Sequence, residues 1–169
     1  MTFEIKKQFT IDVSTDRVWD ILVDQFDDVA HWATGVTTSR PHPETTVYPD
    51  GTSGGRVCEV IGFGATDERL VHYHRERREF GYSVDAEKIP GFVQNLTNHW
   101  RLTAVGTSTR VDMHVTADIS GPLGSIIKPM MRRRFEKVLV QIEADLVSYA
   151  ETGHVSLGKS DEPASRAAA

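Results

Sequence analysis

The chain has one cysteine, Cys58, among its 169 residues, so it cannot form a disulfide within itself, and it has no Cys-x-x-Cys or Cys/His finger spacing for a metal site. No apolar run approaches the roughly 20 residues that a transmembrane helix needs. The N-terminus opens directly into strand-like alternation and lacks the apolar core of a signal peptide. We therefore expect a soluble, cytoplasmic protein that binds no metal and makes no stable membrane insertion.

A basic surface is also missing. The net charge is −5 at pH 7, whereas binding to nucleic-acid phosphates requires clustered positive charge. We expect no nucleic-acid partner. No P-loop, dinucleotide fingerprint, nucleophile elbow or Ser/His/Asp pattern is present. The sequence therefore predicts no cofactor, and an enzymatic activity would have to depend on a binding pocket alone.

The strongest pattern that is present is a long amphipathic helix from Pro122 to about Tyr149. Its apolar residues recur with the helical period, and they are Ile127, Met130, Met131, Phe135, Val138, Leu139, Ile142, Leu146 and Tyr149. Polar residues such as Gln141 and Asp145 lie mainly off this stripe. Pro129 should kink or interrupt the helix, and Gly153 should cap its end. A stripe of this length must cover a large apolar surface, and a sheet is the only partner that the chain offers.

The residues before this helix predict that sheet. Ser14 or Thr15 caps a short helix after the first strand, and Asp27 caps a second one that carries Trp32. The segment Val36–Val47 contains two prolines and is an edge strand or irregular. The clearer strands, from their alternation and turn residues, are Phe3–Val13, Arg56–Gly62, Thr66–Tyr73, Phe80–Ala86 and the two strands of a hairpin over Leu96–Ile119.

The turn Gly106-Thr107 fixes the register of that hairpin. One face becomes apolar and the other charged, so the pattern and the turn agree. The apolar face carries the pairs Leu102–Val111, Trp100–Met113 and Asn98–Val115, and the other carries Arg101–Asp112 and His99–His114. We expect the apolar face to point at the long helix, with Asn98 as its polar exception.

These elements predict an α+β helix-grip fold, in which a curved antiparallel sheet of about seven strands wraps around the long helix. Residues 1–153 form one domain, and residues 154–169 have the composition of a disordered tail. The motifs Val13–Leu22, Gly55–Val57, Asp67–Leu70, Phe80–Val84 and Thr109–Val111 occur in the order typical of one superfamily. In these residues the chain resembles the START-like (SRPBCC) proteins, which include polyketide cyclases/dehydrases and lipid-transport proteins.

That resemblance implies a cavity between sheet and helix that binds a small hydrophobic molecule. Plant abscisic-acid receptors are a similar subgroup. Resemblance to them implies that the residues bordering the cavity are Cys58, Val60, Glu68, Tyr82, Leu96, Asn98, Phe135, Leu139 and Glu143. The loop Gly62–Ala65 lacks the gate sequence of those receptors, so abscisic acid is not the expected ligand. With the inward residues of the hairpin and helix, the candidate ligand-binding set is Cys58, Val60, Glu68, Tyr82, Leu96, Asn98, Trp100, Met113, Met131, Phe135, Leu139 and Ile142.

Several candidates have a plainer alternative. Glu68 is either an acid/base group or the partner of Arg56 in a buried ion pair, and we favour the ion pair. His72 shares a strand face with His74, but no third metal ligand follows at a telling distance. Asn98, Tyr82 and Trp100 either contact a ligand or complete a packed core, and a buried amide needs partners in both cases.

The segments around Trp32, Phe63 and Phe92 are predicted to meet at one end of the fold as a gate of exposed aromatic side chains. In the alternative, Trp32 plugs the short helices and Phe92 anchors its loop. Three function classes stay open: a binder or carrier of a small hydrophobic molecule, an aromatase/cyclase with Glu68, Tyr82 or His72 moving protons, and an interaction module with a filled core. We favour the binder, and protein partners are not predicted.

Overall fold

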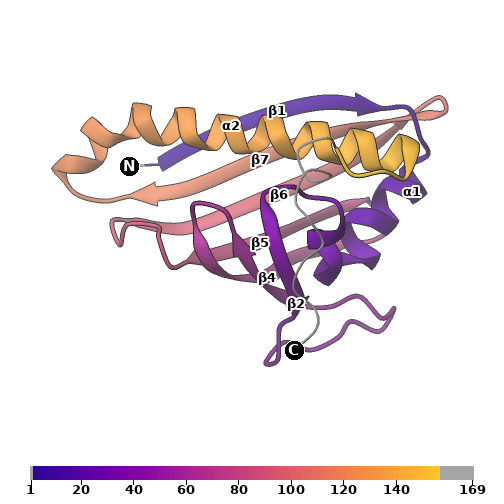
Figure 1. The fold of residues 1–169 in the computed structure, drawn as a ribbon, viewed down its shortest axis with the longest axis horizontal. Coiled ribbons are helices and arrows are strands. Elements are labelled where there is room, and N and C mark those ends of the chain that lie inside the picture. Colours follow the sequence, from indigo (N-terminus) through magenta and orange to yellow (C-terminus); the bar gives the residue numbers. More distant parts are fainter. Residues whose placement is uncertain (1, 157–169) are drawn as a thin grey trace, which may run out of the picture.

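The computed structural model describes residues 2–156, except for the side chains of residues 122–126. Seven antiparallel strands form one sheet in the order β1-β7-β6-β5-β4-β3-β2 (Figure 1). The strands are β1 (Thr2–Ile11), β2 (Val36–Pro41), β3 (Gly55–Val60), β4 (Gly64–His74), β5 (Glu79–Ala86), β6 (Val93–Val105) and β7 (Ser108–Ile119). Three short helical segments, α1 (Thr15–Trp19), η1 (Asp20–Asp24) and η2 (Phe26–His31), follow β1, and α2 (Pro122–Thr152) ends the fold.

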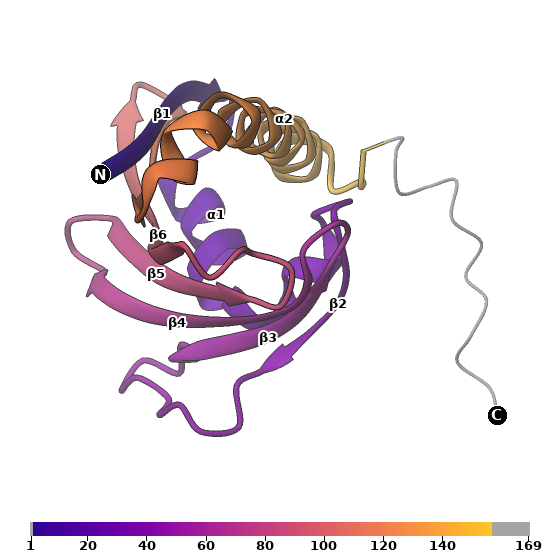
Figure 2. The same cartoon turned by 90° about the vertical axis from the view of Figure 1, so that its left-hand side faces the viewer.

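The helix-grip architecture is confirmed. Figure 2 shows α2 above a sheet that curves around the space beneath it, with the short helices closing one end. α2 lies beside β1, which is the strand that it contacts most closely. The hydrophobic core lines the inner face of the sheet and includes buried residues of the short helices and of α2.

The β6–β7 hairpin has the predicted register throughout its central part. Leu102 lies opposite Val111, Trp100 opposite Met113 and Asn98 opposite Val115. Gly106 adopts a φ of 62°, which the first central position of this two-residue turn requires. Alternation places Trp100 and Asn98 on the inner face, where both are buried. The hairpin therefore fixes two of the candidate site residues.

The short helices match the prediction in place but not in detail. Ser14 caps α1, since its hydroxyl accepts a hydrogen bond from the Arg17 amide at 3.3 Å. The predicted cap at Asp27 is wrong, because η2 begins at Phe26 and has Gln25 in the capping position with no side-chain bond. η2 is a 3₁₀ segment, and such tight turns form without a capping side chain.

α2 runs through Pro129 as one helix, so of the predicted kink or interruption the interruption does not occur. Two other residues of α2 lie differently from the prediction. Met130 is 66% exposed although it was placed on the apolar stripe, while its neighbour Met131 is buried. Asp145 was placed off the stripe but is 1% exposed. Gly153 ends the helix in the left-handed conformation, as predicted. Most of the predicted disordered tail, residues 157–169, lies outside the described residues.

Candidate functional site

A cavity of about 520 Å³ lies between the inner face of the sheet, the short helices and α2. Ligand pockets of roughly 300–1,000 Å³ hold drug-sized molecules. Its wall is mainly apolar and is supplied by η1, η2, the sheet, the loops after η2 and β3, and one face of α2. The apolar members include Leu22, Phe26, Val29, Trp32, Val60, Phe63, Phe80, Val84, Leu96, Trp100, Val115, Phe135, Leu139 and Ile142. The curvature of the sheet keeps α2 off its central strands and leaves this space.

Arg56 and Glu68 form a buried ion pair in the wall, as favoured from the sequence. The Arg56 Nη2 and Nε atoms lie 2.6 and 2.7 Å from Glu68 Oε2, and each residue is 7% exposed. Arg56 also donates to the Phe26 carbonyl at 2.8 Å and stacks over the Phe26 ring. Burial is the largest influence and lowers the pKa of Arg56, but the nearby acidic groups, Glu68 first among them, together raise it above its ordinary value. The guanidinium therefore stays charged beside Glu68.

Tyr82 and Asn98 supply a second polar group on the adjacent strands. They face each other across β5 and β6, and Asn98 Nδ2 donates to the Tyr82 hydroxyl at 3.1 Å. Burial, followed by the negative charge of Glu68, raises the pKa of Tyr82 to about 12. The phenol is thus protonated at neutral pH. Asn98 Oδ1 is buried without a hydrogen-bond partner among the described residues.

Two indole groups in the wall are also unpaired. The Nε1 atoms of Trp32 and Trp100 are buried, and within residues 2–156 neither makes a well-formed hydrogen bond, although the Trp100 indole lies near enough to the Tyr82 hydroxyl to lower its pKa. Buried polar groups in folded proteins nearly always have a partner. The residues that carry these unpaired atoms all border one hollow, and a guest or water within it is the nearest source of the missing partners.

The exposed members of the wall mark where the cavity meets solvent. They are Ile61 in the β3–β4 turn and Lys137 and Gln141 on α2. Asp145 is a buried residue of the wall next to these exposed residues, and its hydrogen bonds connect α2 with the loop that follows η2. Its Oδ2 atom accepts from the amide and the hydroxyl of Thr34, both at 2.7 Å, and its Oδ1 atom accepts from Gln141 at 2.8 Å. Ser156 also donates to Oδ1. The η2–β2 loop is thereby attached to α2.

The structure places most of the candidate ligand-binding residues around one space. Val60, Glu68, Tyr82, Leu96, Asn98, Trp100, Phe135, Leu139 and Ile142 all line the cavity. Cys58, Met113 and Met131 are buried in the core instead, outside its lining. Burial raises the pKa of the Cys58 thiol to about 11, so this group is an unreactive core residue. Glu143 lies outside the lining and pairs with Lys7 at 2.6 Å.

The predicted gate segments meet, but their aromatic side chains are not exposed as expected. The Lys88 amide donates to the Phe63 carbonyl, and the Ile61 amide donates to the Gly35 carbonyl, so hydrogen bonds link the loops. Trp32 and Phe63 are 5% and 9% exposed and line the cavity. Phe92 packs against the core outside the lining. The apolar rings turn inward because Phe63 packs on Phe135, with Arg134 stacked over it.

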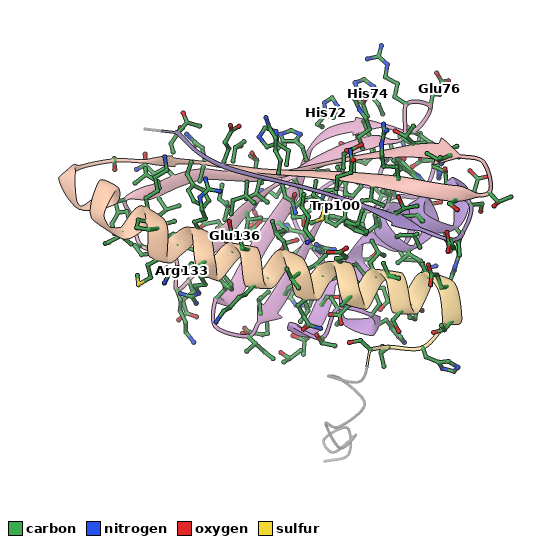
Figure 3. All side chains as sticks on the ribbon, turned by 90° about the horizontal axis from the view of Figure 1, so that it is seen from above. His72, His74, Glu76, Trp100, Arg133 and Glu136 are labelled. Carbon is green, nitrogen blue, oxygen red and sulfur yellow. The ribbon has the colours of Figure 1, made fainter. Side chains whose placement is uncertain are left out.

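His72 lies on the other side of the sheet. Figure 3 shows His72 and His74 on the side away from α2, whereas Trp100 lies between sheet and helix. The His72 ring is 4.7 Å from that of His74 and 6.0 Å from that of His99, and its Nε2 atom lies 3.7 Å from Glu79. Among the described residues no cluster of three or more potential metal ligands is arranged to hold an ion. His72 therefore has no access to a molecule in the cavity.

Sequence reasoning missed Thr34 and Asp145 at the rim. Asp145 follows Ile142 by three residues and precedes Tyr149 by four, so its position on the apolar face could have been found from spacing alone. Its acidic type led to the opposite assignment. Thr34 carried no signal, because it lies in an irregular loop where no periodicity applies.

Comparison with known proteins agrees with this geometry. The profile of the family described as "Polyketide cyclase / dehydrase and lipid transport" matches residues 2–151. The chain belongs to this family. Membership indicates either binding of hydrophobic ligands or a cyclase-type activity, and it does not choose between them. A comparison with curated proteins gives no match.

Solved structures with the same fold include members of this broad group. The Zhui aromatase/cyclase from Streptomyces sp. R1128 has a TM-score of 0.70 at 14% identity, with 92% of this chain and 100% of that chain covered. A START superfamily protein from Mycobacterium smegmatis has a TM-score of 0.70 at 14% identity over 89% and 99% of the two chains. The structure of Ara h 8.0201 has a TM-score of 0.63 at 12% identity over 88% and 99%. These identities establish a common fold. No helix within residues 2–156 is long and apolar enough to cross a membrane.

Proposed function

We propose that the protein binds or carries a small hydrophobic molecule in the cavity between the sheet and α2. The observation that carries this proposal is the cavity itself, about 520 Å³ in volume and walled mainly by apolar side chains. Transfer of apolar surface from water into such a site contributes about 25 cal/mol per Å². An interaction module with a filled core would have no use for this space.

The cyclase alternative requires groups that move protons at the substrate. Tyr82, with its pKa raised to about 12, holds its proton firmly at neutral pH, and Glu68 is bound to Arg56. His72 lies outside the cavity. General acid/base catalysis works best with a pKa near the working pH. The groups first considered for proton transfer therefore support binding better than catalysis.

Entry through the rim is part of the same proposal. The η2–β2 loop, the β3–β4 turn and α2 surround the exposed part of the wall, and their hydrogen bonds to one another close it. Trp32 and Phe63 form the inner surface of this gate rather than its outer lips, and Phe92 supports the β5–β6 loop from the core.

A matched pair of substitutions on α2 tests the proposal. Ile142 lines the cavity, whereas Val140 is 56% exposed and faces away from it. The neutral dye N-phenyl-1-naphthylamine should bind wild type and Val140→Trp equally. Ile142→Trp should weaken binding by about tenfold or more, which corresponds to about 1.4 kcal/mol, because the larger indole occupies space in the cavity that the dye needs. Dye fluorescence measures this, with thermal unfolding as the check on folding.

Native mass spectrometry of protein purified from its own host gives the second readout. Wild type and Val140→Trp should carry an apolar molecule that Ile142→Trp lacks. Equal dye binding in the two folded variants, or no binding by wild type, would refute the proposal.

A further inference from the structure

Asn98 is the most unusual polar residue of the cavity. It lies in the middle of β6 on the inner face, is 7% exposed and lines the hollow. Its Nδ2 atom donates to the Tyr82 hydroxyl, while Oδ1 has no partner in the described part of the chain. Exchanging the two amide atoms would not remove the deficit, because Nδ2 would then be the unpaired atom. One side of this amide requires a partner that residues 2–156 do not supply.

Tyr82 presents the complementary group beside it. Its oxygen accepts the bond from Asn98, and a phenol that accepts a bond still has its own hydrogen to donate. The raised pKa of Tyr82 keeps that hydrogen in place at neutral pH. The two side chains together therefore offer one acceptor, Asn98 Oδ1, and one donor, the Tyr82 hydroxyl, on neighbouring strands.

The charges nearby disfavour an anionic ligand head. Arg56 already donates to Glu68 and to the Phe26 carbonyl. Glu68 and Arg56 act on Tyr82 in opposite directions, so the pair offers no free positive charge to a carboxylate placed there. Burial of an uncompensated charge costs far more free energy than burial of a neutral hydroxyl. A carboxylate, in addition, has no hydrogen to donate to Asn98 Oδ1.

We propose that the ligand is a neutral, largely apolar alcohol or phenol whose hydroxyl group lies between Asn98 and Tyr82. The ligand hydroxyl donates to Asn98 Oδ1 and accepts from the Tyr82 hydroxyl, so the unpaired oxygen of Asn98 and the hydrogen of Tyr82 each gain a partner. This assignment rests on the proposed binding function and specifies its ligand class. A site built to bond a hydroxyl discriminates against analogues that lack one, because its own polar atoms are then left unpaired.

Three pyrene probes of matched shape test the assignment at pH 7. They are 1-hydroxypyrene, 1-methylpyrene and pyrene-1-carboxylate, and their fluorescence responds to the polarity of the site. We expect 1-hydroxypyrene to bind about tenfold more tightly than 1-methylpyrene, since each net hydrogen bond contributes about 1 kcal/mol. Pyrene-1-carboxylate should bind most weakly of the three.

Two cavity variants and one control identify the residues responsible. Asn98→Leu and Tyr82→Phe should each remove most of the preference for 1-hydroxypyrene while 1-methylpyrene binds as before. Ser83→Ala removes a hydroxyl from the opposite face of β5, next to Tyr82, and should leave the preference intact. Asn98→Leu should keep or raise the thermal unfolding midpoint, because it replaces an unpaired buried amide with an apolar group.

The outcomes separate the two proposals. If no probe binds wild type, the binding function fails and this assignment fails with it. If 1-hydroxypyrene and 1-methylpyrene bind equally well, the cavity binds hydrophobic molecules and the hydroxyl assignment is overturned. Tightest binding of pyrene-1-carboxylate overturns it too, as does a preference that survives in both cavity variants.

Discussion

Arg56 and Glu68 show how a single pair of residues shapes the cavity wall. They lie opposite each other on β3 and β4, and Arg56 reaches over the rings of Phe26 and Tyr82. The pair places two charges in an apolar wall with little net field, because each neutralises the other. A buried pair of this kind adds little stability over an apolar pair, but loss of one partner is costly.

Removal of the carboxylate should therefore destabilise the fold strongly. Glu68→Leu leaves the Arg56 guanidinium buried with only a carbonyl partner and the neighbouring rings, and we expect unfolding to become easier by about 3–5 kcal/mol. The double variant Arg56→Met/Glu68→Leu should recover most of that loss. Urea denaturation of the two single variants and the double variant measures this coupling. A double variant less stable than both single variants would contradict it.

At the scale of elements, Asp145 joins α2 to the η2–β2 loop. Its four hydrogen bonds come from Thr34, Gln141 and Ser156, and none comes from a cation. An asparagine here would turn an amide hydrogen toward at least one of these donors. The loop would then lose part of its attachment at the rim of the cavity.

Asp145→Asn should accordingly speed exchange of N-phenyl-1-naphthylamine into and out of the cavity. We expect both rate constants to rise several-fold with a smaller change in affinity, and stability to fall by about 1–3 kcal/mol. Stopped-flow fluorescence gives the rates. Glu136→Gln, which changes an exposed acid on the same helix, serves as control. Rates that match in Asp145→Asn and the control would show that this contact does not limit entry.

The elements also show what sequence can predict. The central register of the β6–β7 hairpin was predicted correctly because a period of two and a glycine turn specify both face and register, whereas the shift between Gln94 and Thr97 was not predicted. From it followed the inward positions of Leu96, Asn98 and Trp100. Predictions failed where local pattern is lacking or was set aside. The 3₁₀ segment η2 has no periodicity of its own. The spacing of Asp145 places it on the apolar face, but its partner Thr34 lies in a loop 111 positions away, so no local signal explained a buried acid there.

At the scale of the whole molecule, the cavity separates α2 from the middle of the sheet. α2 lies beside the edge strand β1, with the short helices below one end of it, as Figures 1 and 2 show. Its inner residues Phe135, Leu139 and Ile142 face the hollow instead of a fully packed neighbour. A bound molecule would supply the missing contacts and would join the helix to β5 and β6.

Ligand binding should therefore protect α2 more than any other element. With 1-hydroxypyrene at 100 times its dissociation constant, the native state gains about 2.7 kcal/mol, so the unfolding midpoint rises. Amide hydrogen exchange should slow most over residues 135–142 and in the η2–β2 loop. The β6–β7 turn around Gly106 is far along the hairpin from the lining residue Asn98 and serves as an internal control. If ligand slowed amide exchange at that turn but not in α2, the ligand would bind outside the cavity.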